Sequence, residues 1–202
     1  MELKRVVVTG LGAVTPLGNT IPDFWNSITN GVSGAGPITR FDASLFKTQF
    51  ACEVKGFDPS LYFDRKESRK LDIYSQYAIA VAKEAIENSG LDLESVDKDE
   101  VGVIFAAGIG GITTFEQEVG YYYQNLENGP KFNPFFIPKM ISDIAAGQIS
   151  IMYGFRGPNY YQGDRAVSYK GKTISPTSTS TSLKSFTVTS SSSSSSRSSV
   201  SS

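Results

Sequence analysis

Apolar and polar positions divide residues 1–160 into short apolar runs and longer amphipathic segments. Residues 5–9 and 101–107 are rich in β-branched and aliphatic side chains and are closed by glycine. This pattern predicts two buried strands, and residues 50–54 form a third candidate strand. Longer segments with apolar residues at helical spacing predict helices at residues 21–30, 67–89, 113–125 and 141–153.

The ends of these segments carry the expected signals. Pro22 suits the first turn of a helix, and Gly90 is a natural stop for the helix over residues 67–89. A loop rich in proline and glycine is expected over residues 128–138. Strands separated by helices predict an α/β fold, with a mainly parallel sheet covered by helices on both faces.

A second region differs sharply in composition. Serine occupies 16 of the 28 positions from 175 to 202, and no acidic residue follows Asp164. So little apolar surface does not offset the entropy of ordering a chain. We therefore predict two regions, a globular one over residues 1–160 and a Ser/Thr-rich tail over 161–202. The tail is either disordered or non-native, as a shifted reading frame after Tyr160 would produce.

Charge and composition narrow the class of protein. The net charge is −1, and no basic cluster of the kind that binds nucleic acid dominates the chain. The chain has no apolar run of about 20 residues, the length that spans a bilayer, and its first residues do not resemble a signal peptide. A cytoplasmic location is expected. With one cysteine and no histidine, an internal disulfide and histidine chemistry are both excluded for these 202 residues.

Two glycine clusters follow the predicted strands. Gly10-Leu11-Gly12 does not fit a dinucleotide-binding turn, because Thr15 stands where the third glycine belongs and Pro16 follows it. It is interpreted as a turn after a strand. Gly108-Ile109-Gly110-Gly111 is either a tight strand-to-helix turn or a loop that bounds a substrate pocket.

Three further features have competing interpretations. Cys52 stands beside Glu53 and lacks a histidine partner, so it is predicted to be a half-buried strand residue and not a nucleophile. The basic run over residues 65–70 is either the solvated start of a helix or a docking patch for an acidic partner. The aromatic residues at 121–123 and 132–137 are either core or an interface segment.

Taken together, the motifs resemble the type II β-ketoacyl-acyl-carrier-protein synthases over residues 1–160. The resemblance rests on the run from Val6 to Gly18, Arg40-Phe41-Asp42, residues 65–78, Gly108-Ile109-Gly110-Gly111, residues 133–138 and residues 151–159. It implies an incomplete N-terminal half of the thiolase-like αβαβα fold. It also implies an acyltransferase of fatty acid biosynthesis, which condenses an acyl thioester with malonyl-acyl carrier protein in a decarboxylative Claisen reaction.

The same resemblance assigns substrate-shaping positions and partners. It places Ile109 in the wall of the acyl pocket, and it places Phe135, Phe136 and Ile137 near a dimer interface from which they reach the partner's pocket. Acyl carrier protein and acyl thioesters are the implied partners. The family forms homodimers, and no metal or other cofactor is expected.

Where the family has an Ala-Cys-Ala-Thr-Ser nucleophile turn, this chain has residues 161–168, with Ala166 near the expected cysteine. The family's two histidines are also absent from these residues, so no catalytic residue is assigned and the 202-residue chain is expected to be inactive alone. Two alternatives remain open. It is a non-catalytic fragment that binds an intact synthase subunit or acyl carrier protein, or a fragment made unstable by an exposed apolar sheet face.

Overall fold

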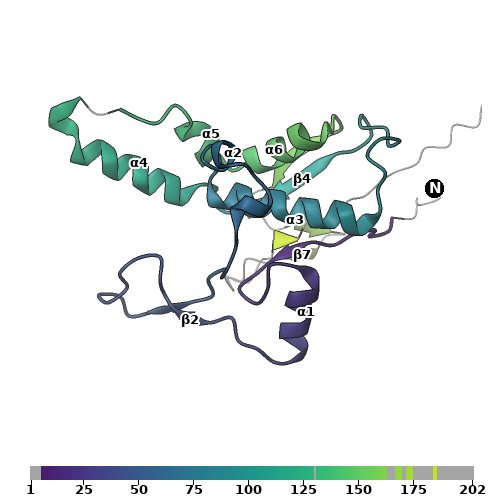
Figure 1. Cartoon of the computed structure of the whole chain (residues 1–202), viewed down its shortest axis with the longest axis horizontal. Coiled ribbons are helices and arrows are strands. Elements are labelled where there is room, and N and C mark those ends of the chain that lie inside the picture. Colours follow the sequence, from purple (N-terminus) through teal and green to yellow (C-terminus); the bar gives the residue numbers. More distant parts are fainter. Residues whose placement is uncertain (1–5, 130, 163–166, 170–171, 175–183, 186–202) are drawn as a thin grey trace, which may run out of the picture.

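A computed structural model describes residues 6–129, 131–162, 167–169, 172–174 and 184–185 (Figure 1). The helices are α1 (Ile21–Thr29), η1 (Pro59–Leu61), α2 (Arg65–Ser68), α3 (Ile73–Ser89), α4 (Ile112–Gln124), η2 (Leu126–Asn128), α5 (Phe136–Met140) and α6 (Ile144–Tyr153). The strands are β1 (Ala13–Val14), β2 (Gly36–Pro37), β3 (Phe50–Ala51), β4 (Val103–Ala106), β5 (Asn159–Gln162), β6 (Val167–Tyr169), β7 (Lys172–Ile174) and β8 (Lys184–Ser185).

Helix α3 is the centre of the hydrophobic core. Ten of its residues are buried, and it packs closely against α6. Its end matches the prediction, because Gly90 adopts the left-handed conformation (φ 66°) that glycine accepts without strain. The core is completed by β4 and by α6, and its largest fully buried side chains include Ile79, Ile149 and Val103.

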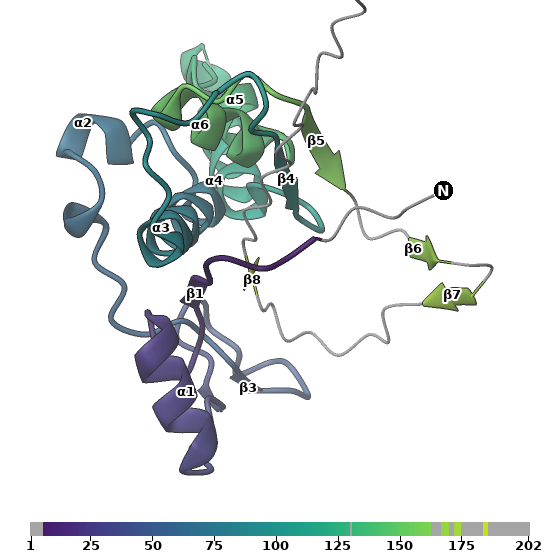
Figure 2. The same cartoon turned by 90° about the vertical axis from the view of Figure 1, so that its right-hand side faces the viewer.

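Strands β4 and β5 form a parallel pair in which Val103 lies opposite Asn159 and Ala106 opposite Gln162. Val103 and Phe105 face the core and α6, whereas Ile104, on the other face, is 63 % exposed. Figure 2 shows α3 and α6 on one side of this pair. The expected α/β class is therefore present, and within the described residues the helices cover one face of the pair.

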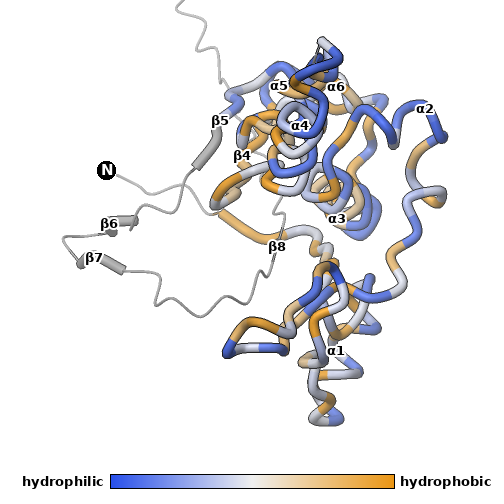
Figure 3. The backbone as a smooth tube through the Cα atoms, turned by 90° about the vertical axis from the view of Figure 1, so that its left-hand side faces the viewer, coloured by the Kyte–Doolittle hydropathy of each residue, from blue (hydrophilic) through white to orange (hydrophobic). Residues whose placement is uncertain are grey.

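The other described strands are two or three residues long and pair antiparallel, β1 with β8, β2 with β3, and β6 with β7. The predicted strand over residues 50–54 is thus shortened to β3. The prediction of a strand over residues 5–9 is wrong for its described part. Residues 6–9 form no strand, and Val6, Val7 and Val8 are exposed. An apolar run favours burial but needs neighbouring elements to bury it. Figure 3 shows this run as a hydrophobic stretch of the tube.

The predicted helix over residues 67–89 is divided in two. The helix is interrupted at residues 69–72, because the Asp72 side chain accepts a hydrogen bond from the Tyr74 N–H and so begins a new helix. The loop expected at residues 128–138 ends in the short helix α5, which extends beyond it to Met140 and was not predicted from the sequence pattern. Helices α1, α4 and α6 begin and end within a few residues of their predicted bounds. Most of the predicted tail, residues 161–202, lies outside the described residues.

Candidate functional site

The glycine turn after β4 makes an unusually close contact with another segment. Gly110 has φ 81°, and a Cβ atom added there would lie 2.4 Å from the carbonyl oxygen of Met140. A Cβ atom on Gly111 would lie 2.4 Å from the Lys139 carbonyl oxygen, and the Gly111 N–H donates to the Met140 carbonyl at 3.0 Å. The cluster is therefore a strand-to-helix turn that starts α4, and it also borders a cleft. That this cleft binds a substrate stays a prediction.

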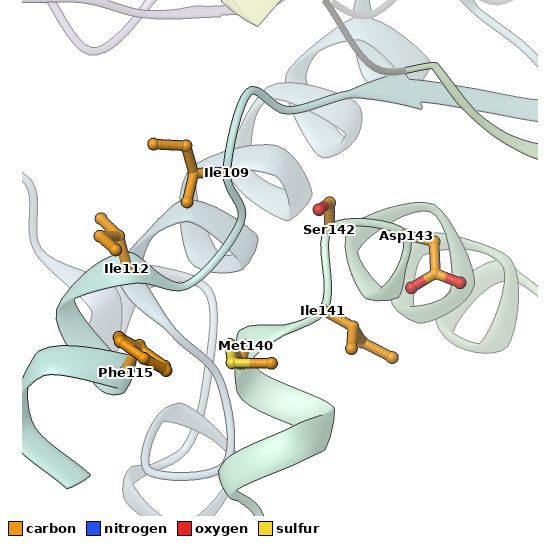
Figure 4. A pocket seen from close by; sticks show the side chains of 7 residues that line it. All are labelled: Ile109, Ile112, Phe115, Met140, Ile141, Ser142 and Asp143. Carbon is orange, nitrogen blue, oxygen red and sulfur yellow. The ribbon is translucent and has the colours of Figure 1, made fainter. Parts of the chain in front are cut away.

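This cleft has a volume of about 560 Å³ and two walls. The wall formed by the glycine turn and the first turn of α4, the α4 wall, supplies Ile109, Ile112 and Phe115. The facing wall, here the 140–143 wall, supplies Met140, Ile141, Ser142 and Asp143 (Figure 4). Most of the lining is apolar, which suits a hydrocarbon ligand.

Buried polar contacts lie beneath the cleft at the start of α3. Asp72 is 5 % exposed, and its Oδ2 atom accepts hydrogen bonds from the Thr114 N–H at 3.3 Å and the Thr114 hydroxyl at 2.6 Å. Two residues further on, the Tyr74 hydroxyl donates to the Ile141 carbonyl. Burial, reinforced by the nearby carboxylates of Asp72 and Asp143, raises the pKa of Tyr74 to about 12. Tyr74 is therefore a neutral hydrogen-bond donor at physiological pH.

The predicted substrate-shaping residues fall in different places. Ile109 lines the cleft and is 68 % exposed. Phe136 is half-buried and stacks on Phe115 of the α4 wall, with ring centroids 6.2 Å apart. Phe135 and Ile137 are exposed and outside the cleft lining, and the Lys70 ammonium lies 5.9 Å from the centre of the Phe135 ring. Their roles toward a partner subunit stay predictions.

Most of the cleft was not predicted from the sequence. Asp72 and Tyr74 were not singled out, although an aspartate before an apolar periodic run is a recognised helix-start signal. In the 140–143 wall, Met140 ends α5, and residues 141–143 were predicted to begin the helix over residues 141–153, so none was expected to line a cleft. Their role depends on contact with a turn about 30 residues earlier in the chain.

Cys52 is exposed and lies just after β3, so the prediction of a half-buried strand residue is wrong. Strand β3 pairs with β2 alone, and nothing among the described residues buries its end. Of the basic run, Arg65 and Lys66 lie in the short helix α2 and are exposed, as are Arg69 and Lys70 after it. The solvated-helix interpretation therefore fits, and the docking interpretation stays open.

A second cleft of about 730 Å³ lies between the segment from Ile38 to Glu53 and α4. Hydrogen bonds from the Thr39 hydroxyl and N–H hold the Glu53 carboxylate and keep its pKa below the usual range. Among the described residues, no group of three histidine, cysteine, aspartate or glutamate side chains is placed to hold a metal ion. No helix in the described part of the chain is long and apolar enough to cross a membrane.

Several solved structures that superimpose on this chain are ketosynthases. The ishigamide ketosynthase/chain length factor superimposes with a TM-score of 0.71 at 22 % identity, over 81 % of this chain and 41 % of that one. A type II polyketide ketosynthase, AntDE, solved in complex with its acyl-carrier protein AntF, superimposes with a TM-score of 0.62 at 26 % identity, over 81 % and 42 % of the two chains. The described residues thus have the fold of the N-terminal part of a ketosynthase.

Residues 3–162 match the family of the β-ketoacyl synthase N-terminal domain, and the chain belongs to this family. It is 48 % identical over 160 residues to 3-oxoacyl-[acyl-carrier-protein] synthase 2 of Coxiella burnetii, and 43 % identical over 160 residues to the Synechocystis enzyme of the same name. Each alignment covers 79 % of this chain and 38 % of the relative. The chain therefore spans well under half the length of these relatives.

Proposed function

We propose that this chain supplies the N-terminal portion of a 3-oxoacyl-acyl-carrier-protein synthase, and that its cleft holds part of an acyl chain. The observation that carries this proposal is the apolar cleft between the glycine turn and the 140–143 wall. Ile109, Ile112 and Phe115 present hydrocarbon surface there, and each buried methylene of a ligand would contribute about 0.8 kcal/mol. Family membership supplies the reaction class, fatty acid elongation.

Acyl binding is tested with palmitate and the purified 202-residue chain. Ile109→Asp should weaken palmitate binding about tenfold or more, because it places a carboxylate on the apolar wall. Ile151→Asp is a matched control, since Ile151 is an exposed isoleucine on α6 and outside the cleft. Equal affinities for the two variants, or an unmodified chain that does not bind palmitate, would contradict the proposal.

We further propose that the 202-residue chain does not condense acyl and malonyl thioesters by itself. Cys52 is exposed just after β3 and the chain contains no histidine, so this thiol has no histidine base to activate it. The assay is formation of 3-oxoacyl product from acyl- and malonyl-acyl carrier protein, with chain purified free of host synthase. Product above the background of a Cys52→Ser variant would overturn this part of the proposal.

The alternative function is non-catalytic binding of acyl carrier protein or of an intact synthase subunit. The exposure of Arg65, Lys66, Arg69 and Lys70 supports it, and no ion pair within the described residues neutralises these four. The structurally similar ketosynthase AntDE was solved with its own acyl-carrier protein. An acidic partner would be attracted to such a patch through long-range electrostatics.

A double charge reversal tests this alternative. Arg65→Glu with Lys66→Glu should weaken binding of acyl carrier protein about tenfold, and the loss should shrink as salt is raised. Lys47→Glu with Lys55→Glu gives the same change in net charge at exposed positions outside the patch. If both double variants bind alike, or if the unmodified chain shows no binding, the basic run is only a solvated helix start.

A further inference from the structure

The start of α3 contacts both walls of the cleft through side chains two residues apart. Asp72 is the residue before the first turn of α3, and Tyr74 lies in that turn. Asp72 binds Thr114, on the α4 wall, and Tyr74 binds the carbonyl of Ile141, on the 140–143 wall. Each wall is therefore tied to the same point on a third element.

These ties are buried and mutually dependent. Asp72, Tyr74 and Thr114 are each less than a tenth exposed. The Asp72 Oδ1 atom also accepts from the Tyr74 N–H at 3.0 Å, so the carboxylate that binds the α4 wall fixes the backbone of the tyrosine that binds the opposite wall. Since a buried polar group left without a partner costs about 1–3 kcal/mol, neither tie is readily broken.

The two walls, each bound to the start of α3, also contact each other directly. The Gly111 N–H donates to the Met140 carbonyl at 3.0 Å. Gly111 lacks the Cβ atom that would come within 3.1 Å of the Asp72 Oδ2 atom and 2.4 Å of the Lys139 carbonyl oxygen. The three contacts leave the walls little freedom to move apart or together.

We infer that Asp72 and Tyr74 are positioning residues that set the separation of the two walls, and thereby the width of chain that the cleft accepts. The consequence for ligands rests on the acyl-binding function proposed above. If the walls are held at a set separation, we expect the cleft to bind a straight hydrocarbon chain more tightly than one with a mid-chain methyl branch. Loosening either tie lets the walls separate and reduces that discrimination.

Amide hydrogen exchange tests the wall separation without any ligand. Tyr74→Phe removes the hydroxyl and keeps the ring, and it should raise exchange of the Gly111 amide at least about fivefold, because the 140–143 wall is released. Tyr153→Phe is the matched control, since it removes a hydroxyl from a half-buried tyrosine at the far end of α6. Unchanged Gly111 exchange in Tyr74→Phe, or the same increase in Tyr153→Phe, would overturn the inference.

Selectivity between ligands tests the consequence. The ratio of affinities for palmitate and for a mid-chain methyl-branched palmitate should fall at least about fivefold in Tyr74→Phe and in Thr114→Val, and stay unchanged in Thr114→Ser, which keeps the hydroxyl. If these residues only stabilise the fold, the substitutions should lower the affinity for both ligands equally. An unchanged ratio would therefore refute the role in selectivity. If the unmodified chain binds neither ligand but Tyr74→Phe still raises exchange of the Gly111 amide, the acyl-binding function is wrong and the positioning role stands.

Discussion

At the scale of single residues, Gly12 shows why the first glycine turn has the sequence it has. A Cβ atom on Gly12 would lie 2.2 Å from the Val81 carbonyl oxygen, on the backbone of α3. Gly12→Ala must therefore push the N-terminal segment off α3, and we expect a loss of about 3 kcal/mol or more in the free energy of unfolding. Denaturant titration measures it.

Gly36→Ala is the control for that substitution. The nearest atom to a Cβ at Gly36 is the Lys55 ammonium nitrogen at 3.8 Å, at the end of a flexible side chain. A change within about 0.5 kcal/mol is expected there. Comparable losses in the two variants would mean that Gly12 is not closely packed against α3.

Tyr74 makes the free energy of unfolding depend on pH in the alkaline range. Its pKa is raised from the ordinary 10 to about 12 in the folded chain, so the native state holds this proton more tightly than the unfolded state does. The resulting stabilisation is complete below pH 10 and is lost as the pH rises toward 12. Tyr74→Phe cannot ionise, so its free energy of unfolding should fall less steeply over this range. Parallel pH profiles for the two proteins would contradict this assignment.

At the scale of elements, two glycines at different helix positions should respond in opposite ways to alanine. Gly120 lies inside α4, where a Cβ atom added to it would have no atom within 4 Å, whereas Gly90 ends α3 in the left-handed conformation. Gly120→Ala should raise the free energy of unfolding by about 0.5–1 kcal/mol, and Gly90→Ala should lower it by about 1 kcal/mol. Thermal unfolding of both variants would show it, and shifts of the same sign would contradict it.

The elements also show which sequence signals were sufficient. The glycine stop at Gly90 located the C-terminal end of α3, and apolar periodicity located the bodies of α4 and α6, because these signals act within a few residues. The break before α3 depends on Asp72, whose carboxylate competes with a continuous helix for the Tyr74 N–H. The prediction of a strand over residues 6–9 was wrong, because a strand needs a neighbouring strand and the local pattern carries no information about one.

The candidate site was predictable on one side only. The glycine turn and Ile109 were recognisable from their place after a strand and from the family motif. The facing wall is brought there by the Gly111–Met140 and Tyr74–Ile141 contacts, which join positions far apart in the chain. Periodicity and capping signals are local, so they carry no information about such pairs.

At the scale of the whole molecule, exposed apolar side chains are expected to limit the solubility of the chain. Ile104 on the open face of β4 and the run from Val6 to Val8 are exposed together with Ile151 and Tyr160. Ile104 lies opposite Tyr160 in the β4–β5 pair, and exposed apolar side chains that lie side by side promote association. Ile104→Lys should increase the concentration at which the chain stays in solution, with little change in melting temperature.

The neighbouring residue on the same strand provides the control. Val103 is 1 % exposed and faces the core, so Val103→Lys buries a charge and should abolish cooperative unfolding. Light scattering and circular dichroism distinguish the two outcomes. If Ile104→Lys aggregates as readily as the unmodified chain, another surface drives association.

The contacts beneath the cleft also set an order of assembly during synthesis. The partner of Asp72 lies 42 positions later in the chain, and the partner of Tyr74 lies 67 positions later. At about 5–20 residues per second, translation leaves the start of α3 waiting some 3–13 s before the second wall emerges. Over that interval the Tyr74 hydroxyl is solvated by water, whereas Asp72 waits only about 2–8 s for Thr114. The residues of α3 therefore leave the ribosome well before the cleft can be completed.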